Sequence, residues 1–252
     1  MKVYFVGAGP GEPDLLTVKG ERLLKNCRVC IYAGSLVSPA VLGLIPPDAE
    51  KYNSAERSLE DIVSIYRQAK QKGLDVIRLH SGDPSIYGAI REQMDPLDRL
   101  GIEYEVVPGI SSFQASAAAL RTELTAPEIA QTIILTRSSG RTPLPPEQEL
   151  ERLARTKATL CIFLSGDKTE EIAKELAPFY GKDCPAAVVY HASWPDQKIV
   201  EGSLEEIGAK AQEAGIGDTS MIVVGRALSR NLPASKLYDP GFSHKFRKGK
   251  RT

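Results

Sequence analysis

The stretch that decides the fold is residues 3–17, VYFVGAGPGEPDLLT. It begins with Val3–Val6, an apolar run that ends in glycines, as buried strands do. The next segment, Val18–Cys27, has helical spacing of its apolar residues, and Thr17 is placed to cap it. A buried strand, a glycine turn and a helix in this order predict an α/β fold with a largely parallel sheet.

The same alternation continues through the first half of the chain. Ser58 begins a clear amphipathic helix that Gly73 ends. The remaining predicted elements of this half are strands at Arg28–Tyr32, Val76–His80 and Tyr104–Val107, and helices at Ile86–Leu100 and Ser111–Arg121. Strands that alternate with helices indicate βαβ units.

A composition shift at Glu123–Glu128, ELTAPE, predicts a linker to a second α/β lobe. In that lobe Ser203 and Glu206 have the spacing of a capping box. Its other predicted elements are strands at Thr132–Thr136, Thr159–Leu164, Ala186–Tyr190, Lys198–Glu201 and Met221–Val224, and helices at Glu147–Arg155 and Lys168–Ala177. We therefore expect a lobe at residues 1–122, a second at 123–232 and a tail at 233–252.

The 252 residues carry 32 basic and 32 acidic side chains, and 42% of them are hydrophobic. No stretch is long and apolar enough for a membrane helix, and no signal peptide is evident, which predicts a cytoplasmic protein. The last eight residues, KFRKGKRT, hold five of the basic side chains. The balance over the whole chain argues against a strongly basic nucleic-acid binder, and the body without the tail is mildly acidic. We expect this basic tail to be solvated; a contact with a partner enzyme or with substrate carboxylates is a hypothesis.

The cysteines and histidines do not form a recognisable metal or triad motif. Cys27 and Cys30 form a single CxxC without a second pair, so buried structural thiols are the simpler interpretation, with redox or metal roles as alternatives. His80 lies at a strand end and is expected to be a satisfied core histidine. His191 and His244 form no triad with a serine or cysteine motif.

Four polar or glycine-rich motifs each follow a predicted strand of the first lobe: GAGPGEPDLLT, YAGSLV, HSGDPSIYG and VPGISS. Because ligands of open α/β sheets bind outside the carboxyl ends of the strands, these loops predict one binding site. A dinucleotide fingerprint is incomplete, since Glu12 replaces its third glycine and Pro10 lacks an N–H. A nicotinamide-dependent reductase stays as an alternative of another class. Asp83 is either a cap for a helix at Ser85 or an acceptor for a ligand.

At this point the residues show a resemblance. VGAGPGEPDLLTVKG, SGDPSIYG, VVPGISS and TIILTR resemble the tetrapyrrole (corrin/porphyrin) methyltransferase family, over residues 1–232. ELTAPEIAQTIILTR, GRTP, YHASWPDQKIVEGSL and the tail LYDPGFSHKFRKG are similar to its C11-methyltransferase subfamily. The resemblance implies a two-lobed fold with a cleft between the lobes, and S-adenosylmethionine-dependent methylation of precorrin-4 at C11, giving precorrin-5, in cobalamin biosynthesis. It also implies a homodimer without a metal.

The resemblance implies these cofactor-binding positions: Pro10, Ser81, Gly82, Asp83, Ile86, Ser111, Ser112, Leu164 and Ala192. Some relatives carry an aspartate after the second strand as a proton acceptor. Here Ala33–Ser35 stand at that place, so we name no catalytic residue. This is compatible with the chemistry, because an activated methyl group and a nucleophilic ring carbon chiefly need alignment.

The carboxylates of such a substrate need basic partners. The candidates are Arg137 and Arg141, then Arg91, Arg121 and Lys198, each of which is otherwise a solvated surface side chain. Other substrates remain open: the cobalt form of precorrin-4, a ring methylated at C17 or C20, or ribosomal RNA. A catalytically silent binding module is a further alternative. The Ala33–Ser35 loop favours the metal-free, aerobic branch.

Overall fold

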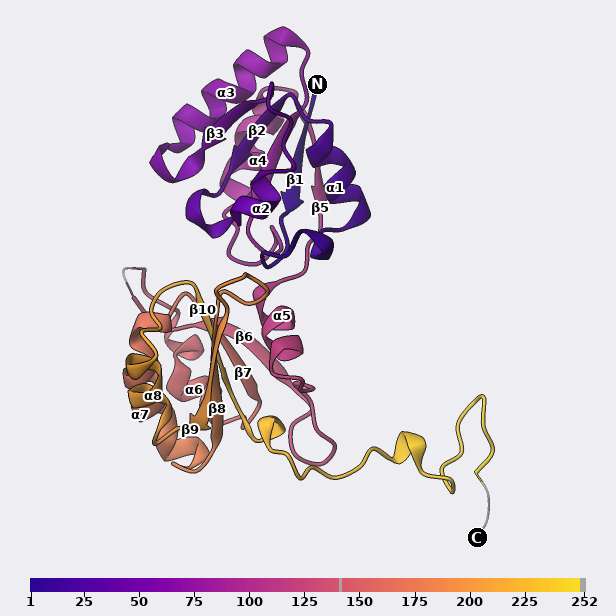
Figure 1. Ribbon diagram of the computed structural model, residues 1–252, viewed down its shortest axis with the longest axis vertical. Coiled ribbons are helices and arrows are strands. Elements are labelled where there is room, and N and C mark those ends of the chain that lie inside the picture. Colours follow the sequence, from indigo (N-terminus) through magenta and orange to yellow (C-terminus); the bar gives the residue numbers. More distant parts are fainter. Residues whose placement is uncertain (141, 250–252) are drawn as a thin grey trace. The chain divides into compact units, whose positions relative to one another are not determined.

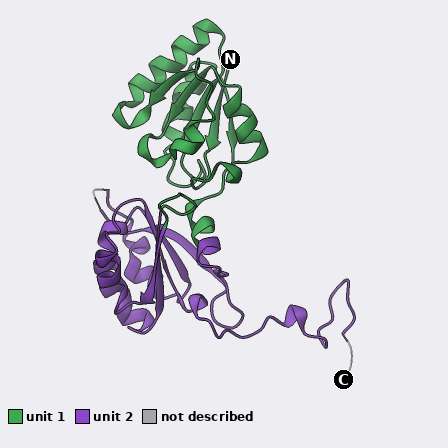
Figure 2. Ribbon diagram, in the orientation of Figure 1, with its two compact units in different colours: residues 1–116, 191–197 green, residues 117–190, 198–252 purple. Residues whose placement is uncertain are grey.

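The computed structural model describes residues 1–140 and 142–249. Its contacts divide the chain into two compact units (Figure 2): unit 1 is Met1–Ser116 with His191–Gln197, and unit 2 is Ala117–Tyr190 with Lys198–Thr252. The short segment His191–Gln197 thus packs with unit 1, although its neighbours on both sides in the sequence belong to unit 2. The expected division into lobes at residue 122, with a tail after 232, stays a prediction.

Unit 1 contains a five-stranded sheet in the order β3-β2-β4-β1-β5. The pairings β1–β4, β1–β5, β2–β3 and β2–β4 are all parallel, which confirms the α/β class. The strands are β1 Lys2–Gly7, β2 Val29–Tyr32, β3 Glu50–Asn53, β4 Val76–His80 and β5 Glu103–Val107. The prediction missed β3 because its sequence, EKYN, has no apolar run, as befits an edge strand.

Helices cover both faces of this sheet (Figure 1). On one face α1 Val18–Lys25 and the short α2 Pro39–Leu42, which was not predicted, bury Leu24 and Val41 against the strands. On the other face, α3 Leu59–Lys72 and α4 Arg91–Arg99 bury Tyr66 and Leu97. Helix α5, Ser112–Ala119, follows β5 and spans the boundary between the units.

The helix ends show which local signals were reliable. Thr17 caps α1 as predicted, and Ser58 caps α3, where Asp61 completes a capping box and Gly73 ends the helix at φ +65°. The helix predicted to begin at Ile86 begins at Arg91 instead, because residues 86–90 form turns with positive φ at Tyr87 and Ala89. Those turns carry part of the loop that follows β4.

Unit 2 contains a mixed sheet in the order β6-β7-β10-β8-β9. Only the β6–β7 pairing in this order is parallel. Its strands are β6 Ile133–Arg137, β7 Thr159–Phe163, β8 Pro185–Tyr190, β9 Lys198–Ser203 and β10 Ser220–Val224. Its helices α6 Leu150–Ala154, α7 Thr169–Tyr180 and α8 Ile207–Glu213 lie on one side of the sheet (Figure 1). They enclose a core of residues such as Leu160, Leu176 and Ile207.

The capping box predicted at Ser203 is half present. The Glu206 carboxylate accepts the Ser203 N–H at 3.2 Å, but α8 begins only at Ile207, after a turn.

In the tail, the described residues 233–249 are mostly exposed, and the Arg247 guanidinium donates to the carbonyls of Leu237 and Asp239 at 2.7 Å. Among the described helices, none has the length and apolarity to cross a membrane.

Candidate active site in unit 1

The loops after β1, β4 and β5 meet through three glycines that leave no room for side chains. A Cβ on Gly7 would lie 2.6 Å from both the Gly109 Cα and the Gly82 carbonyl oxygen, and one on Gly109 would lie 2.2 Å from that oxygen. Gly9 and Gly82 also exchange backbone hydrogen bonds, at 3.2 and 2.9 Å. The predicted convergence of these loops at the carboxyl edge of the sheet is therefore present in unit 1.

Asp83 links two of these loops. Its carboxylate accepts the Gly109 N–H at 2.9 Å, the Ser85 N–H at 2.8 Å and the Ser85 hydroxyl. Partial burial raises the pKa of Asp83, but the hydrogen bonds from Ser85 and Gly109 outweigh this and bring the pKa below its ordinary value. Asp83 is thus an anion that caps a turn, not a helix, and ties the β4 loop to the β5 loop.

The serine pair after β5 lies against the same glycines. A Cβ on Gly82 would lie 3.5 Å from the Ser111 Cα and 3.8 Å from the Ser112 nitrogen. Ser111 is buried, and its N–H donates to Gln114 at 3.0 Å. Ser81 is exposed beside Gly82, and Ile86 is half-buried with its N–H donating to the Asp83 carbonyl at 3.2 Å. These predicted cofactor positions lie along one continuous set of loops.

Pro10 is held by the segment His191–Gln197. The Trp194 indole N–H donates to the Pro10 carbonyl at 2.7 Å, and the Ser193 hydroxyl oxygen accepts the Glu12 N–H at 3.0 Å. Buried Ala192 belongs to the same segment and so to the same unit as Pro10. Leu164 follows β7 in unit 2, where it is 67% exposed. Its part in a cofactor site stays a prediction.

Strained backbone marks several of these loops. Positive φ at non-glycine residues occurs at Tyr87 and Ala89 after β4, at Leu164 after β7, and at His191 and Ser193 after β8; Arg121, Glu128, Lys157 and Thr219 adopt it elsewhere in the chain. Such conformations cost of order 1–3 kcal/mol each and persist where the surrounding structure holds them, which is common at functional sites. Five of the nine strained residues in the described chain thus lie in loops that contain or adjoin predicted cofactor positions.

His80, at the end of β4, is buried but not satisfied. It is 4% exposed, and its Nε2 has no hydrogen-bond partner among the described residues, so the expectation of a satisfied histidine was wrong. Burial and the neighbouring Arg78 lower the pKa of His80 to about 3. His80 is therefore neutral near pH 7 and adds no positive charge beneath the loops.

The candidate site in unit 1 offers neither a metal cluster nor a base after β2. In the described chain no three His, Cys, Asp or Glu side chains gather as metal ligands would, and all four cysteines are buried free thiols. Ala33–Ser35 follow β2, and Gly34 takes φ +56°. The Tyr32 carbonyl before them accepts the Ser54 hydroxyl at 3.0 Å.

The loops fit S-adenosylmethionine chemically. This cofactor combines a sulfonium cation with amino, carboxylate, ribose and adenine groups, which neutral hydrogen-bonding groups can satisfy. Glycine, serine and alanine dominate the loops, so the backbone can approach a ligand closely. A neutral His80 and an anionic Asp83 are compatible with a bound cation.

The predicted substrate-binding cations are not gathered at one place. Arg91 is exposed at the start of α4 in unit 1. In unit 2 the Arg137 guanidinium donates to the carbonyls of Ser138, Thr142 and Pro143 at 3.0–3.2 Å, and Lys198 donates to the Ala214 carbonyl at 2.9 Å. Both side chains therefore fix their own loops. Arg141 lies outside the described residues.

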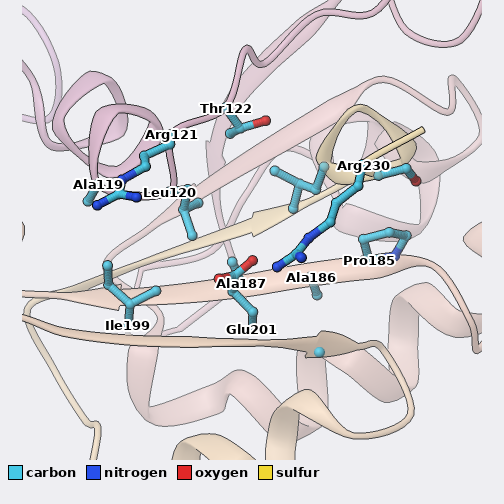
Figure 3. Close-up of a pocket in the computed structure, with 13 residues that line it drawn as sticks. Ala119, Leu120, Arg121, Thr122, Pro185, Ala186, Ala187, Ile199, Glu201 and Arg230 are labelled. Atoms are coloured by element: carbon cyan, nitrogen blue, oxygen red, sulfur yellow. The ribbon is translucent and has the colours of Figure 1, made fainter. Parts of the chain in front are cut away.

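Arg121 lines a groove of about 840 Å³ on unit 2. Arg230 and Thr122 line it as well, together with Ala187 of β8 and Glu201 of β9 (Figure 3). This groove belongs to unit 2 alone and contains none of the predicted cofactor positions. Of the proposed substrate contacts, Arg121 is thus the one that lies in a described concavity.

Sequence reasoning missed the contacts that Trp194 and its neighbours make. The imidazole of His191 stacks on the Trp194 indole at a centroid distance of 4.4 Å, and its Nδ1 lies 3.0 Å from both Asp196 carboxylate oxygens. The motif YHASWPDQ had been used only for its resemblance. The single tryptophan of the chain, a residue whose indole N–H needs an acceptor when it is buried, was the available signal.

Comparison with known proteins shows the family of the chain. The sequence pattern of the family Tetrapyrrole (Corrin/Porphyrin) Methylases matches residues 2–208. The chain belongs to this family. The precorrin-4 C(11)-methyltransferase of Pseudomonas aeruginosa is 49% identical over 250 residues, 99% of this chain and 100% of that protein.

Two solved structures resemble the fold. Cobalt precorrin-4 methyltransferase CbiF, a cobalamin biosynthetic enzyme, has a TM-score of 0.88 at 44% identity and covers 90% of this chain and 96% of its own. Uroporphyrin-III C-methyltransferase from Thermus thermophilus, complexed with S-adenosyl homocysteine, has a TM-score of 0.75 at 31% identity, covering 90% and 99%. The predicted two-lobed α/β fold of this family is confirmed.

Proposed function

We propose that this protein is a methyltransferase that transfers a methyl group from S-adenosylmethionine to C11 of precorrin-4, giving precorrin-5, in cobalamin biosynthesis. One observation carries the proposal: the glycine and serine loops of the family converge in unit 1 of a chain that is 49% identical over its whole length to a precorrin-4 C(11)-methyltransferase. The 31% identical neighbour solved with S-adenosyl homocysteine supports the cofactor. A nicotinamide-dependent reductase has no such support.

The cofactor positions belong to the proposal. They are Pro10, Ser81, Gly82, Asp83, Ile86, Ser111, Ser112, Leu164 and Ala192. When bound, S-adenosylmethionine supplies a methyl group already activated on a sulfonium. The residues of this chain then need only to bind and orient the reactants, since holding two reacting atoms about 3–3.5 Å apart can contribute roughly 7–11 kcal/mol. No general base is assigned, in keeping with Ala33–Ser35 after β2.

The proposal also covers whether the substrate ring contains cobalt. We take metal-free precorrin-4 as the substrate, because the 49% identical relative carries that name. The cobalt form is the second candidate, because the solved relative with a TM-score of 0.88 is named for it. The carboxylates of either ring need cationic partners, for which Arg91, Arg121, Arg137, Arg141 and Lys198 stay the proposed set.

We also propose a cytoplasmic homodimer. Ile133 and Leu135 on the edge strand β6, and Ile199 on the opposite edge strand β9, each keep 37–39% of their surface exposed, which leaves apolar area for a second copy. Four free, buried thiols suit a reducing compartment. Analytical ultracentrifugation at micromolar concentration tests the dimer: a monomer at all concentrations would contradict it.

Calorimetric titration with S-adenosyl homocysteine tests the cofactor. We expect saturable binding, and no binding at millimolar concentration would refute a methyltransferase. Asp83→Asn should weaken binding about tenfold, because it replaces one of the two carboxylate oxygens that tie the loops with an N–H donor. Asp61→Asn is a matched control, since the Asp61 carboxylate also accepts a serine N–H and hydroxyl, but at the cap of α3. Equal affinity for both variants would leave Asp83 as a turn cap only.

The product of the reaction tests the substrate. Precorrin-4 is incubated with the enzyme and S-adenosylmethionine, and the product is analysed by mass spectrometry and NMR. We expect one added methyl group at C11, and a methyl group at C17 or C20 would overturn the assignment. Parallel incubation with the cobalt form distinguishes the two branches by the faster turnover.

A further inference from the structure

The segment His191–Gln197 makes two hydrogen bonds to the glycine loop after β1, from which it is far apart in the sequence. Trp194 donates its indole N–H to the Pro10 carbonyl at 2.7 Å, across 184 positions of sequence. Ser193 accepts the Glu12 N–H at 3.0 Å. Together they fix the peptide groups on both sides of Gly11.

Trp194 also packs directly on Gly11. A Cβ at this position would lie 2.1 Å from the indole Cδ1 and 2.2 Å from Nε1, so only glycine allows the ring to reach the loop. In addition, the buried Ser38 hydroxyl donates to the Gly11 carbonyl at 2.5 Å. The Pro10–Glu12 backbone is therefore held by two separate parts of the chain.

The segment is itself braced. His191 stacks on the indole, with 23° between the ring planes, and lies 3.0 Å from the Asp196 carboxylate. The backbone N–H of Ser193 donates to the Gln197 side chain at 2.8 Å, and the backbone N–H of Trp194 donates to the His191 carbonyl at 2.9 Å. These contacts hold His191 and Ser193 at φ +46° and +71°. A strained and internally bonded turn presents the indole N–H in one orientation.

We propose that Trp194 is a positioning residue for the cofactor site: it acts through the Pro10 carbonyl to hold the loop after β1 in its binding geometry. The inference rests on the proposed function, in which Pro10 lines that site. It also explains why the segment packs with unit 1 while its sequence neighbours belong to unit 2. The same turn that carries Trp194 carries Ala192, so one element shapes the loop and supplies a neighbouring wall.

Trp194→Phe tests this inference, because it removes the N–H and keeps an aromatic ring. Tyr180→Phe is the matched control: it removes a side-chain donor that bonds the Ala158 carbonyl at 2.6 Å in the core of unit 2. We expect Trp194→Phe to raise the dissociation constant of S-adenosyl homocysteine, and the KM for S-adenosylmethionine, about tenfold, or about 1.4 kcal/mol. The kcat and the KM for the tetrapyrrole should stay within twofold. Tyr180→Phe should bind like wild type.

The readouts separate positioning from mere stability. A substitution that only unfolds part of the protein lowers kcat at constant KM, and this result would overturn the proposal, as would wild-type affinity in Trp194→Phe. If Trp194→Phe does not fold, Ser193→Ala takes its place, since it removes only the acceptor for the Glu12 N–H; unchanged affinity there overturns the proposal. Absence of binding in the wild-type protein instead refutes the proposed function.

Discussion

Replacing Gly11 by alanine should displace Trp194 from its place on the glycine loop. The new Cβ would lie 2.1 Å from the indole Cδ1, whereas ordinary contacts begin near 3.4 Å, so the ring must move by about 1.3 Å (3.4 − 2.1). The 2.7 Å hydrogen bond to Pro10 would then stretch to roughly 4 Å, beyond the range of an N–H···O bond. A planar indole cannot bend away, so the whole ring has to shift.

The expected loss of stability follows from two contributions. A hydrogen bond of this kind contributes about 0.5–1.5 kcal/mol. Gly11 takes φ +154°, and a side chain in such a conformation costs about 1–3 kcal/mol. We expect the free energy of unfolding to fall by about 2–4 kcal/mol. The loss cannot be larger than the cost of detaching the segment His191–Gln197 from the loop, because detachment relieves the clash.

Fluorescence gives a direct assay, because Trp194 is the single tryptophan of the chain. In the Gly11→Ala variant the emission maximum should move to longer wavelength as the indole becomes more exposed, and urea unfolding gives the free energy. Gly73→Ala is the matched control. It places the same side chain at φ +65° in the same unit with nothing within 4 Å, so we expect a loss of about 1 kcal/mol and unchanged emission.

An unchanged emission maximum in Gly11→Ala, with a loss of stability no greater than in Gly73→Ala, would refute the packing of Trp194 on this loop. A red shift with wild-type affinity for S-adenosyl homocysteine would keep the packing but remove its role in the cofactor site. The two measurements therefore test the structure and its functional interpretation separately.

Three further predictions concern unit 1. Because the folded protein lowers the pKa of His80 to about 3, only the unfolded chain gains a proton there as the pH falls below about 6.5. Wild type should therefore lose about 2 kcal/mol more stability between pH 7 and pH 5 than the His80→Gln variant does. Equal losses of the two proteins in urea unfolding would contradict this. Gln93→Leu should cost about 2–4 kcal/mol, because the Gln93 oxygen accepts from both Tyr66 and buried Arg78 at 3.0 Å and the variant leaves both donors without it; a loss under 1 kcal/mol by chemical denaturation would contradict this. Ser58→Ala should cost about 1 kcal/mol by removing the cap of α3, measured the same way, and full wild-type stability would show that the cap contributes nothing.

The parts of the fold that could be predicted are those with a local cause. Apolar runs located β1, β2 and β4, and the pair Ser58 and Gly73 located both ends of α3. The polar edge strand β3 has no such signature, since its stability comes from its pairing with β2. Likewise Ser203 and Glu206 do form one bond of a capping box, but the turn after β9 delays the helix to Ile207.

The candidate site divides in the same way. The loops were predictable because glycine and serine after a strand have a local meaning, whichever ligand they bind. Asp83 shows the limit of that reasoning: its neighbour Ser85 was visible in the sequence, but its acceptance of the Gly109 N–H depends on two strands, β4 and β5, that lie on either side of β1. Its role as a link between loops needed the sheet order.

Trp194 extends this argument. Trp194 is half-buried, and an indole taken out of water usually finds an acceptor for its N–H, so its donor role is a property of the residue type. The acceptor is the Pro10 carbonyl, which lies 184 positions away in the sequence. Glycine at position 11 clears the space for the ring, since a Cβ there would lie 2.1 Å from the indole. The pair Pro10-Gly11 is thus shaped as much for Trp194 as for a ligand, and the loop after β1 is complete only when the segment after β8 is in place.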